Sequence, residues 1–161
     1  MQEIFRFVLL TMCVLLVLIL TPQAPAQWST DPSINNPISV QTTGQHLYLP
    51  TITGDDSGGA IITWYRVGTT PDVYAQRIDV NGVVRWAANG IAISTEAHDQ
   101  INPTIVNDGA GGAVITWEDF RNGANFDIYA QRVNASGAVQ WAANGVGIAT
   151  GGRSRASSHR R

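Results

Sequence analysis

Apolar and polar residues alternate with a two-residue period over several short stretches of this chain, and turns rich in Gly, Asn and Asp separate the stretches. In the clearest case Ala113, Ile115 and Trp117 fall on one face of a strand, because successive side chains of a strand point to opposite faces. Nothing after the first 26 residues has the period of an amphipathic helix. The pattern therefore predicts an all-β fold.

The whole pattern occurs twice. The tryptophans at 64 and 117 are 53 residues apart and the tyrosines at 74 and 129 are 55 apart, so the loop between them is two residues longer in the second copy. A period of this size, rich in Gly, β-branched and aromatic residues, is typical of propeller blades and related arrays. The recurring segments are Pro-Thr-Ile (50–52, 103–105), Gly-Gly-Ala (58–60, 111–113), Ile-Thr-Trp (62–64, 115–117), Asp-Val/Ile-Tyr-Ala-Gln-Arg (72–77, 127–132) and Trp-Ala-Ala-Asn-Gly (86–90, 141–145).

Each copy predicts four antiparallel strands, so the expected fold is two four-stranded propeller-type blades, a partial β-propeller. The turns after the first strands contain Gly, which reaches positive φ, and Asp, which accepts hydrogen bonds from nearby amides. The predicted strands are 48–53, 60–65, 72–79 and 83–86 in the first copy, and 101–106, 113–118, 127–134 and 138–141 in the second.

The segment before the first copy has the same pattern. Ile38-Ser39-Val40 begins 12 residues before Pro50, as Ile91-Ala92-Ile93 begins 12 before Pro103. Closed propellers use such a spare outer strand to complete the last blade, but both copies here already have a predicted fourth strand, and two blades are fewer than the usual four to eight. The expected division is a signal peptide (1–26), a partial preceding repeat (27–49), two blade repeats (50–102 and 103–150) and a disordered Arg-rich tail (151–161).

The N-terminus has the features of an export signal. An apolar run of 14 residues, Phe7 to Leu20, is followed by Ala24-Pro25-Ala26, whose small residues suit a signal peptidase. The run is shorter than the roughly 20 residues that a membrane-spanning helix needs, so a cleaved signal helix is favoured over an uncleaved anchor. We expect cleavage after Ala26 and a secreted or cell-surface protein without a stable membrane span.

The cysteine content argues against disulfides, and the net charge argues against nucleic acid as a partner. Cys13 is the single cysteine and lies in the signal, so the mature chain forms no disulfide. Residues 27–150 contain five arginines and eleven acidic residues. A domain with this net negative charge would repel nucleic acid. Four more arginines lie in residues 151–161, which predicts either a solvated basic tail or a truncated longer chain; truncation would also explain the spare opening strand.

The repeated pattern resembles a known class of protein. Asp108-x-x-Gly-Gly-Ala-x-Ile-Thr-Trp-Glu-Asp-x-Arg121, then Asp127-Ile-Tyr-Ala-Gln-Arg-Val133 and Trp141-x-x-Asn-Gly145, is similar to the propeller-type repeats of large secreted bacterial proteins. The resemblance spans residue 28 to about 150. It implies an exported, non-catalytic β-propeller; relatives of this type often carry many blades and a C-terminal sorting domain, whereas this sequence has two full repeats and no sorting domain.

Residues that recur in both copies are expected to support the blade. Trp64, Trp117, Trp86 and Trp141 are predicted to pack in the core or between blades, as are Tyr74 and Tyr129. Arg77 and Arg132 are expected to form a repeated ion pair, with Asp72 and Asp127 or with a neighbouring blade. Asp55, Asp56 and Asp108 supply too few carboxylates for a calcium loop, so they predict capped turns and no metal or other cofactor.

The histidines and the paired carboxylates do not form a recognisable catalytic motif. His46, His98 and His159 lie at non-equivalent places without a nucleophile motif or metal-ligand spacing. Glu118 and Asp119 are adjacent on a predicted strand and should point to opposite faces, unlike the paired acids of a glycosidase. A non-enzymatic module is the favoured interpretation, and part of a secreted propeller hydrolase of sialidase-like or related type is the alternative.

Positions that differ between the copies are the candidates for recognition, because loops on a rigid scaffold carry function. The second-to-third-strand loop differs most, although an ordinary variable loop would look the same. A carbohydrate or a protein is the expected ligand, and three identical chains could associate to close a six-bladed ring. The candidate binding residues are Tyr65, Arg66, Glu118, Asp119, Phe120 and Arg121.

Overall fold

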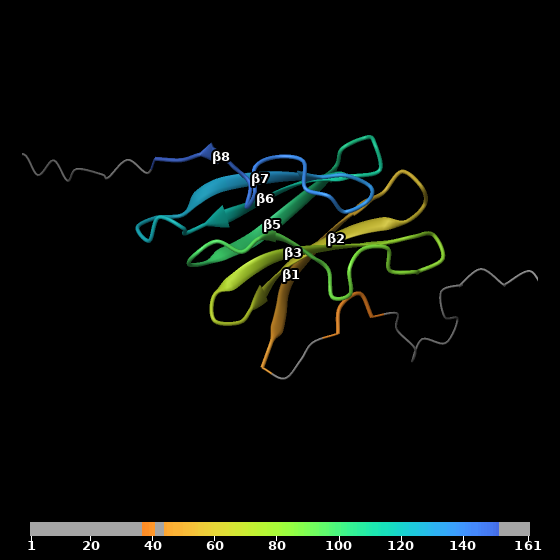
Figure 1. Cartoon of the computed structure of the whole chain (residues 1–161), viewed down its shortest axis with the longest axis horizontal. Helices are drawn as coiled ribbons and strands as arrows, with labels where there is room; N and C mark the ends of the chain where they lie inside the picture. Colours follow the sequence, from red (N-terminus) through yellow and green to blue (C-terminus); the bar gives the residue numbers. More distant parts are fainter. Residues whose placement is uncertain (1–36, 41–43, 152–161) are drawn as a thin grey trace, which may run out of the picture.

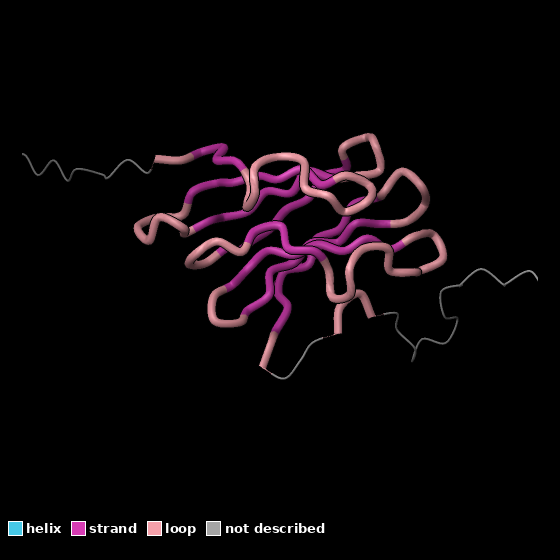
Figure 2. Tube along the Cα trace, in the orientation of Figure 1, coloured by secondary structure: helices cyan, strands magenta, loops and turns pink. Residues whose placement is uncertain are grey.

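The computed structural model describes residues 37–40 and 44–151 as two antiparallel four-stranded sheets (Figures 1 and 2). Residues 1–26, for which an export signal was predicted, the segment 27–36 and the residues from 152 onward lie outside the described residues. No described helix is long and apolar enough to span a membrane. The strands are β1 (His46–Gly54), β2 (Ala60–Val67), β3 (Pro71–Ile78), β4 (Ile91–Ser94), β5 (Gln100–Asn107), β6 (Ala113–Asp119), β7 (Asp127–Val133) and β8 (Val146–Ala149).

Each sheet pairs its strands in chain order, β1-β2-β3-β4 in sheet 1 and β5-β6-β7-β8 in sheet 2. The register is the same in both: Trp64 lies opposite Tyr74, and Trp117 lies opposite Tyr129. The prediction of an all-β fold with two four-stranded antiparallel sheets is thus confirmed, and the residues that recur in the sequence occupy corresponding positions.

The fourth strands are not where the sequence predicted them. Residues 83–86 and 138–141 make only single bridges, Ile78 with Val84 and Val133 with Val139, and the fourth strands are β4 and β8 further along the chain. A buried glutamine of the third strand explains the shift. The side-chain oxygen of Gln76 accepts a hydrogen bond from the Trp86 amide at 3.0 Å, and Gln131 does the same for Trp141. These amides therefore bind a side chain instead of extending a backbone ladder.

The Gly-rich turns after β1 and β5 are capped by their aspartates, as predicted. One carboxylate oxygen of Asp55 accepts from the amides of Ser57 and Gly59, and its other oxygen accepts from Arg77 at 2.8 Å. Gly59 is needed because a Cβ there would collide with the Ile78 carbonyl. Asp108 repeats the arrangement with the amides of residues 110 and 112 and with the guanidinium of residue 132.

The two recurring arginines form a repeated ion pair, as predicted, but the strand aspartates expected as partners were wrong. Arg77 pairs with Asp55, not Asp72, and the pair at 132 uses the turn aspartate at 108, not the one at 127. Asp72 and Arg77 are five residues apart on β3, so their side chains point to opposite faces of the strand, whereas the turn carboxylate is within hydrogen-bond distance of the arginine. Arg77 also reaches the neighbouring sheet, where it donates to the carbonyl of Ala135 at 3.1 Å, but this contact is a hydrogen bond and not an ion pair.

Each sheet has two chemically different faces. We call the face that carries Trp64 in sheet 1 and Trp117 in sheet 2 the front face, and the opposite face, which carries Val73 and Ile128, the back face. The main core forms where the back face of sheet 1 meets the front face of sheet 2, and β5 lies against β1, β2 and β3 (Figure 1). Its buried members are Ile61, Val73, Ala75, Trp86 and Ile93 from sheet 1 and Ala113, Ile115, Trp117 and Val133 from sheet 2.

A second, smaller cluster lies on the front face of sheet 1. Ile62, Trp64, Tyr74 and Ile78 form it, and Ile38 packs against it from the segment 37–40. The Val40 amide donates to the side-chain oxygen of Asn89 at 2.7 Å, and the Thr95 amide donates to that of Asn144 at 3.1 Å.

These two hydrogen bonds correct the alignment of the opening segment. Val40 takes the place of Thr95, so Ile38 corresponds to Ile93 and not to Ile91 as the sequence suggested. The segment 37–40 therefore lies on the front face of sheet 1 as the end of β4 lies on the front face of sheet 2.

Candidate functional site

The six candidate residues lie at the ends of β2 and β6 and in the loop that follows β6. Among the described residues, no hydrogen bond or ion pair joins the two from sheet 1 to the four from sheet 2. The sequence treated them as one variable loop; the structure separates them by role.

Asp119 and Arg121 form an internal ion pair. The Asp119 side chain is fully buried, and the guanidinium of Arg121 donates to both of its oxygens, at 2.9 and 2.7 Å. The indole N–H of Trp117 donates to the same carboxylate at 2.7 Å, and the guanidinium lies 3.7 Å above the ring of Tyr129. Both residues are thus committed to fixing the loop against the front face of sheet 2.

The ion pair also anchors the joint between the sheets. Arg121 donates to the backbone carbonyl of Asn144 at 2.8 Å, and the Asn144 side chain donates to Glu96, just after β4, at 2.9 Å. The Asn144 oxygen in turn accepts from the Thr95 amide. A chain of polar contacts therefore runs from sheet 2 to the end of sheet 1.

The pKa of Asp119 is lowered from its ordinary value of 3.8. Burial of the carboxyl acts to raise the pKa, but the hydrogen bonds from Arg121 and Trp117 and the positive charge of Arg121 outweigh it. Asp119 is therefore ionised in the folded chain at neutral pH, and its charge is balanced by the neighbouring arginine.

Arg66 reproduces part of this arrangement in sheet 1. Its guanidinium lies 3.8 Å above the ring of Tyr74 and also binds the Tyr74 hydroxyl. Burial raises the pKa of Tyr74, with the arginine acting in the opposite direction. Burial likewise raises the pKa of the nearby Asp72, and the charge of Arg66 partly opposes that shift.

The other three candidates differ in availability. Tyr65 is half-buried on the back face of sheet 1 and stacks on Tyr48, with ring centroids 5.4 Å apart. Glu118 is half-buried on the back face of sheet 2 and accepts a hydrogen bond from Asn102 at 3.1 Å. Phe120 packs on Phe126, 5.0 Å between centroids, and the latter ring is 45% exposed. The loop after β6 thus presents an aromatic surface of which the sequence singled out Phe120 but not Phe126.

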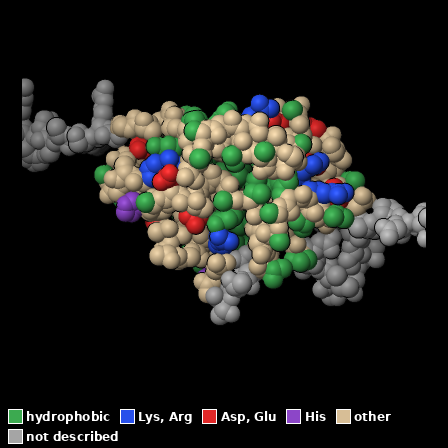
Figure 3. Space-filling view, viewed as in Figure 1, with side chains coloured by type: hydrophobic (Ala, Val, Ile, Leu, Met, Phe, Trp, Pro, Cys, Tyr) green, Lys and Arg blue, Asp and Glu red, His purple; other side chains and the backbone are tan. Residues whose placement is uncertain are grey.

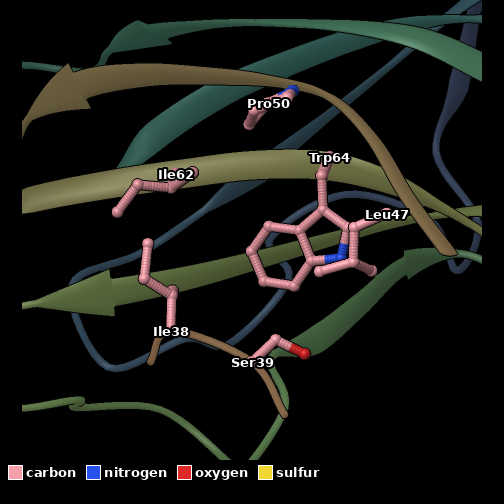
Figure 4. Close-up of a pocket in the computed structure, with 6 residues that line it drawn as sticks. All are labelled: Ile38, Ser39, Leu47, Pro50, Ile62 and Trp64. Atoms are coloured by element: carbon pink, nitrogen blue, oxygen red, sulfur yellow. The ribbon is translucent and has the colours of Figure 1, made fainter. Parts of the chain in front are cut away.

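A pocket of about 250 Å³ lies on the front face of sheet 1 (Figure 4). Its wall includes the indole of Trp64, whose buried N–H has no hydrogen-bond partner. The corresponding N–H of Trp117 binds Asp119, but the equivalent position in sheet 1 is Arg66, which cannot accept a hydrogen bond. Comparing these two positions in the sequence could have revealed the difference. The pocket is lined by Ile38, Ser39, Leu47, Pro50, Ile62 and Trp64.

Other charged side chains of the described residues also form ion pairs within the chain. On the face shown in Figure 3, basic and acidic side chains lie next to one another, while apolar side chains gather across the middle. Within residues 37–40 and 44–151, no three or more His, Cys, Asp or Glu side chains lie close enough together to hold a metal ion. The carboxylate oxygens of the turn aspartates, Asp55 and Asp108, accept hydrogen bonds from backbone amides and arginines.

Comparisons with known proteins add no family to this picture: no family model, no curated protein and no solved structure matches the chain.

Proposed function

We propose that this chain is an exported, non-catalytic repeat module of the β-propeller type, with a binding or structural role at the cell surface or outside the cell. Each four-stranded sheet would be one blade. A carbohydrate or a protein would bind through the loops at the ends of β2 and β6.

The observation that carries the proposal is the way the two sheets meet. Unlike faces are in contact, the back of sheet 1 and the front of sheet 2. When the back of one sheet packs on the front of the next, a front face is left at one end of the pair and a back face at the other. Further sheets can be added at either end by the same contact, as in an array of blades, whereas a closed two-sheet sandwich leaves no such matching faces.

A second contact supports the same view. The hydrogen bond from residue 40 to Asn89 on sheet 1 corresponds to the one from residue 95 to Asn144 on sheet 2. The front face of sheet 1 is thus already bonded as if a further repeat preceded it. Both asparagines also have a positive φ, 66° and 58°, so the two hydrogen bonds are made from the same backbone conformation.

The charged candidates favour a non-catalytic role. Asp119 and Arg121 neutralise each other inside the fold, and Glu118 lies on the other face of β6 from Asp119. Two carboxylates on opposite faces of one strand cannot flank a single scissile bond. The aromatic pair at 120 and 126 remains for contact with a ligand.

The purified protein would test this on a glycan array and on a panel of glycoside, ester and peptide substrates. We expect no turnover, and any ligand found should bind less well after Phe126→Ala, with Val139→Ala as an exposed control away from the loop. Turnover that Glu118→Gln abolishes would replace this proposal with the hydrolase alternative.

A further inference from the structure

The back face of sheet 2 is apolar and uncovered by any described residue. Ile128 is 38% exposed, Trp141 is 39% exposed and Ile148 is 61% exposed. Their counterparts on the back face of sheet 1, Val73, Trp86 and Ile93, are 0%, 9% and 2% exposed because sheet 2 covers them. The same kind of surface is therefore buried at one end of the molecule and open at the other.

The front face of sheet 1 is open along β1, although Ile62 and Trp64 of the neighbouring strand are buried. Ile52 is 65% exposed, whereas its counterpart Ile105 is half-buried against the core. Pro50 is exposed while Pro103 is buried. The pocket beside Trp64 lies on this face, and Leu47 and Pro50 of β1 are among the residues that line it (Figure 4).

We propose that the back face of sheet 2 docks onto the front face of sheet 1 in a second copy of this chain. The contact would repeat, between chains, the joint that already exists inside the chain. It rests on the blade stacking proposed above but is independent of any ligand.

The internal joint supplies the expected contacts. There, the indole N–H of Trp86 donates to the Ala135 carbonyl at 3.1 Å, and Gly137 lies so close to the ring that a Cβ would collide with it. Trp141 is the counterpart of Trp86, and the turn at 80–82 is the counterpart of the turn at 135–137. In the docked pair the indole of Trp141 would pack on this turn of the second copy.

A second copy is favoured because one molecule carries both halves of the interface. Apolar patches of this kind on a soluble protein mark contact surfaces. A contact between unlike faces is heterologous, so it produces a ring when the rotation closes and an open chain when it does not.

Residues 37–40 already occupy one position on the front face of sheet 1. It corresponds to the position that the end of β4 occupies on the front face of sheet 2. An incoming copy brings β8 to the same position, so one of these two short segments must leave it. Substitutions on β1 and β7 test the docking whichever segment leaves, because both strands lie outside the shared position.

The test uses the full chain carrying Ile52→Glu on the front face, Ile128→Glu on the back face, or Val139→Glu as a matched control. Val139 is 42% exposed and lies on neither open face. Sedimentation velocity over a concentration series gives the association of each. Wild type and control should associate, and each single-face variant should associate at least about tenfold more weakly.

The decisive sample is an equimolar mixture of the two single-face variants. Each variant keeps one intact face, so the mixture should recover a one-to-one complex of wild-type affinity. A wild-type chain that stays monomeric at every concentration, or a mixture that does not recover, would overturn the proposal. Association of Ile52→Glu alone at wild-type strength would also overturn it, since that means back-to-back contact.

Thermal melting checks that each variant folds, and Val106→Glu, at a 59% exposed position of β5 on the same back face, replaces Ile128→Glu if that variant does not. Failure of this test would leave the ligand and turnover assays untouched, so the two proposals fail separately.

Discussion

Two tryptophans of sheet 2 show how much the surroundings of a residue decide its contribution. Trp117 is 1% exposed at the joint between the sheets, and Trp141 is 39% exposed on the open back face. The sequence predicted both to be packed, because it showed the same residue type in recurring segments. The sequence did not show that Trp141 lies on an open face and stays partly exposed.

Trp117→Ala should lower the free energy of unfolding by about 3–5 kcal/mol, because it leaves a large cavity in the main core. Trp141→Ala should cost only about 1 kcal/mol, since much of this side chain is already in contact with water. Chemical denaturation at a protein concentration where the chain is monomeric gives both values. Equal losses would show that the burial of these two residues does not differ in solution.

Asp119→Asn should lower stability by roughly 3 kcal/mol near neutral pH, because Arg121 loses its partner in a mostly buried setting. The wild-type pKa of Asp119 is lowered in the folded chain, so its stabilisation is present above about pH 4 and is lost as the pH falls through that lowered pKa. The free energy of unfolding, measured by denaturation at pH values from 3 to 7, should therefore depend less steeply on pH in the variant than in the wild type. Parallel curves would mean that the ion pair contributes no pH-dependent stability.

At the scale of elements, the glutamine of the third strand decides where the fourth strand begins. Gln131 is fully buried, and it accepts hydrogen bonds from the amides of Trp141 and Arg132 and donates to the carbonyl of Ala142. It holds the Trp-Ala-Ala-Asn-Gly segment as a coil that leads into β8.

Gln131→Leu keeps the volume of the side chain but leaves buried backbone groups without partners, so it should cost about 2–3 kcal/mol. Gln140→Leu is the control, because Gln140 is exposed and its side chain makes a single hydrogen bond, to Ala138. Thermal unfolding compares them. Equal melting temperatures for the two variants would show that the buried glutamine does not fix this segment.

The first three strands of each sheet were predictable, because alternation and Gly-rich turns are local signals. The capped turns at 55 and 108 were predictable for the same reason. The fourth strands were not, since the deciding hydrogen bonds come from a glutamine ten residues earlier. The five-residue spacing of Asp72 and Arg77 already places them on opposite faces of a strand, but that the turn aspartate replaces Asp72 depends on how the turn folds, which spacing does not reveal.

The candidate site was predicted only in outline. Sequence differences identified the loop after β6, but they could not show that Asp119 and Arg121 neutralise each other. Nor could they show that Phe126, outside the predicted set, is 45% exposed. Side-chain pairing within a loop depends on three-dimensional packing, which two aligned segments do not contain.

At the scale of the whole molecule, export remains a prediction from residues 1–26, outside the described residues. If the signal is cleaved, the N-terminal sequence of secreted material should begin at or near Gln27. The measurement is Edman or mass-spectrometric sequencing after expression in a secreting host. Full-length chain retained in carbonate-washed membranes would show that this segment is an anchor.

The stacking of unlike faces has an evolutionary consequence. Each joint needs the same back surface and the same front surface, so duplicating one unit of the gene adds a sheet that fits without any new interface having to evolve. Substitutions should then spread in matched pairs, one in the back surface of a unit and one in the front surface of the unit that follows. The exchange of Asp at 119 for Arg at 66, which leaves the Trp64 N–H without an acceptor, marks a place where the two units have already diverged.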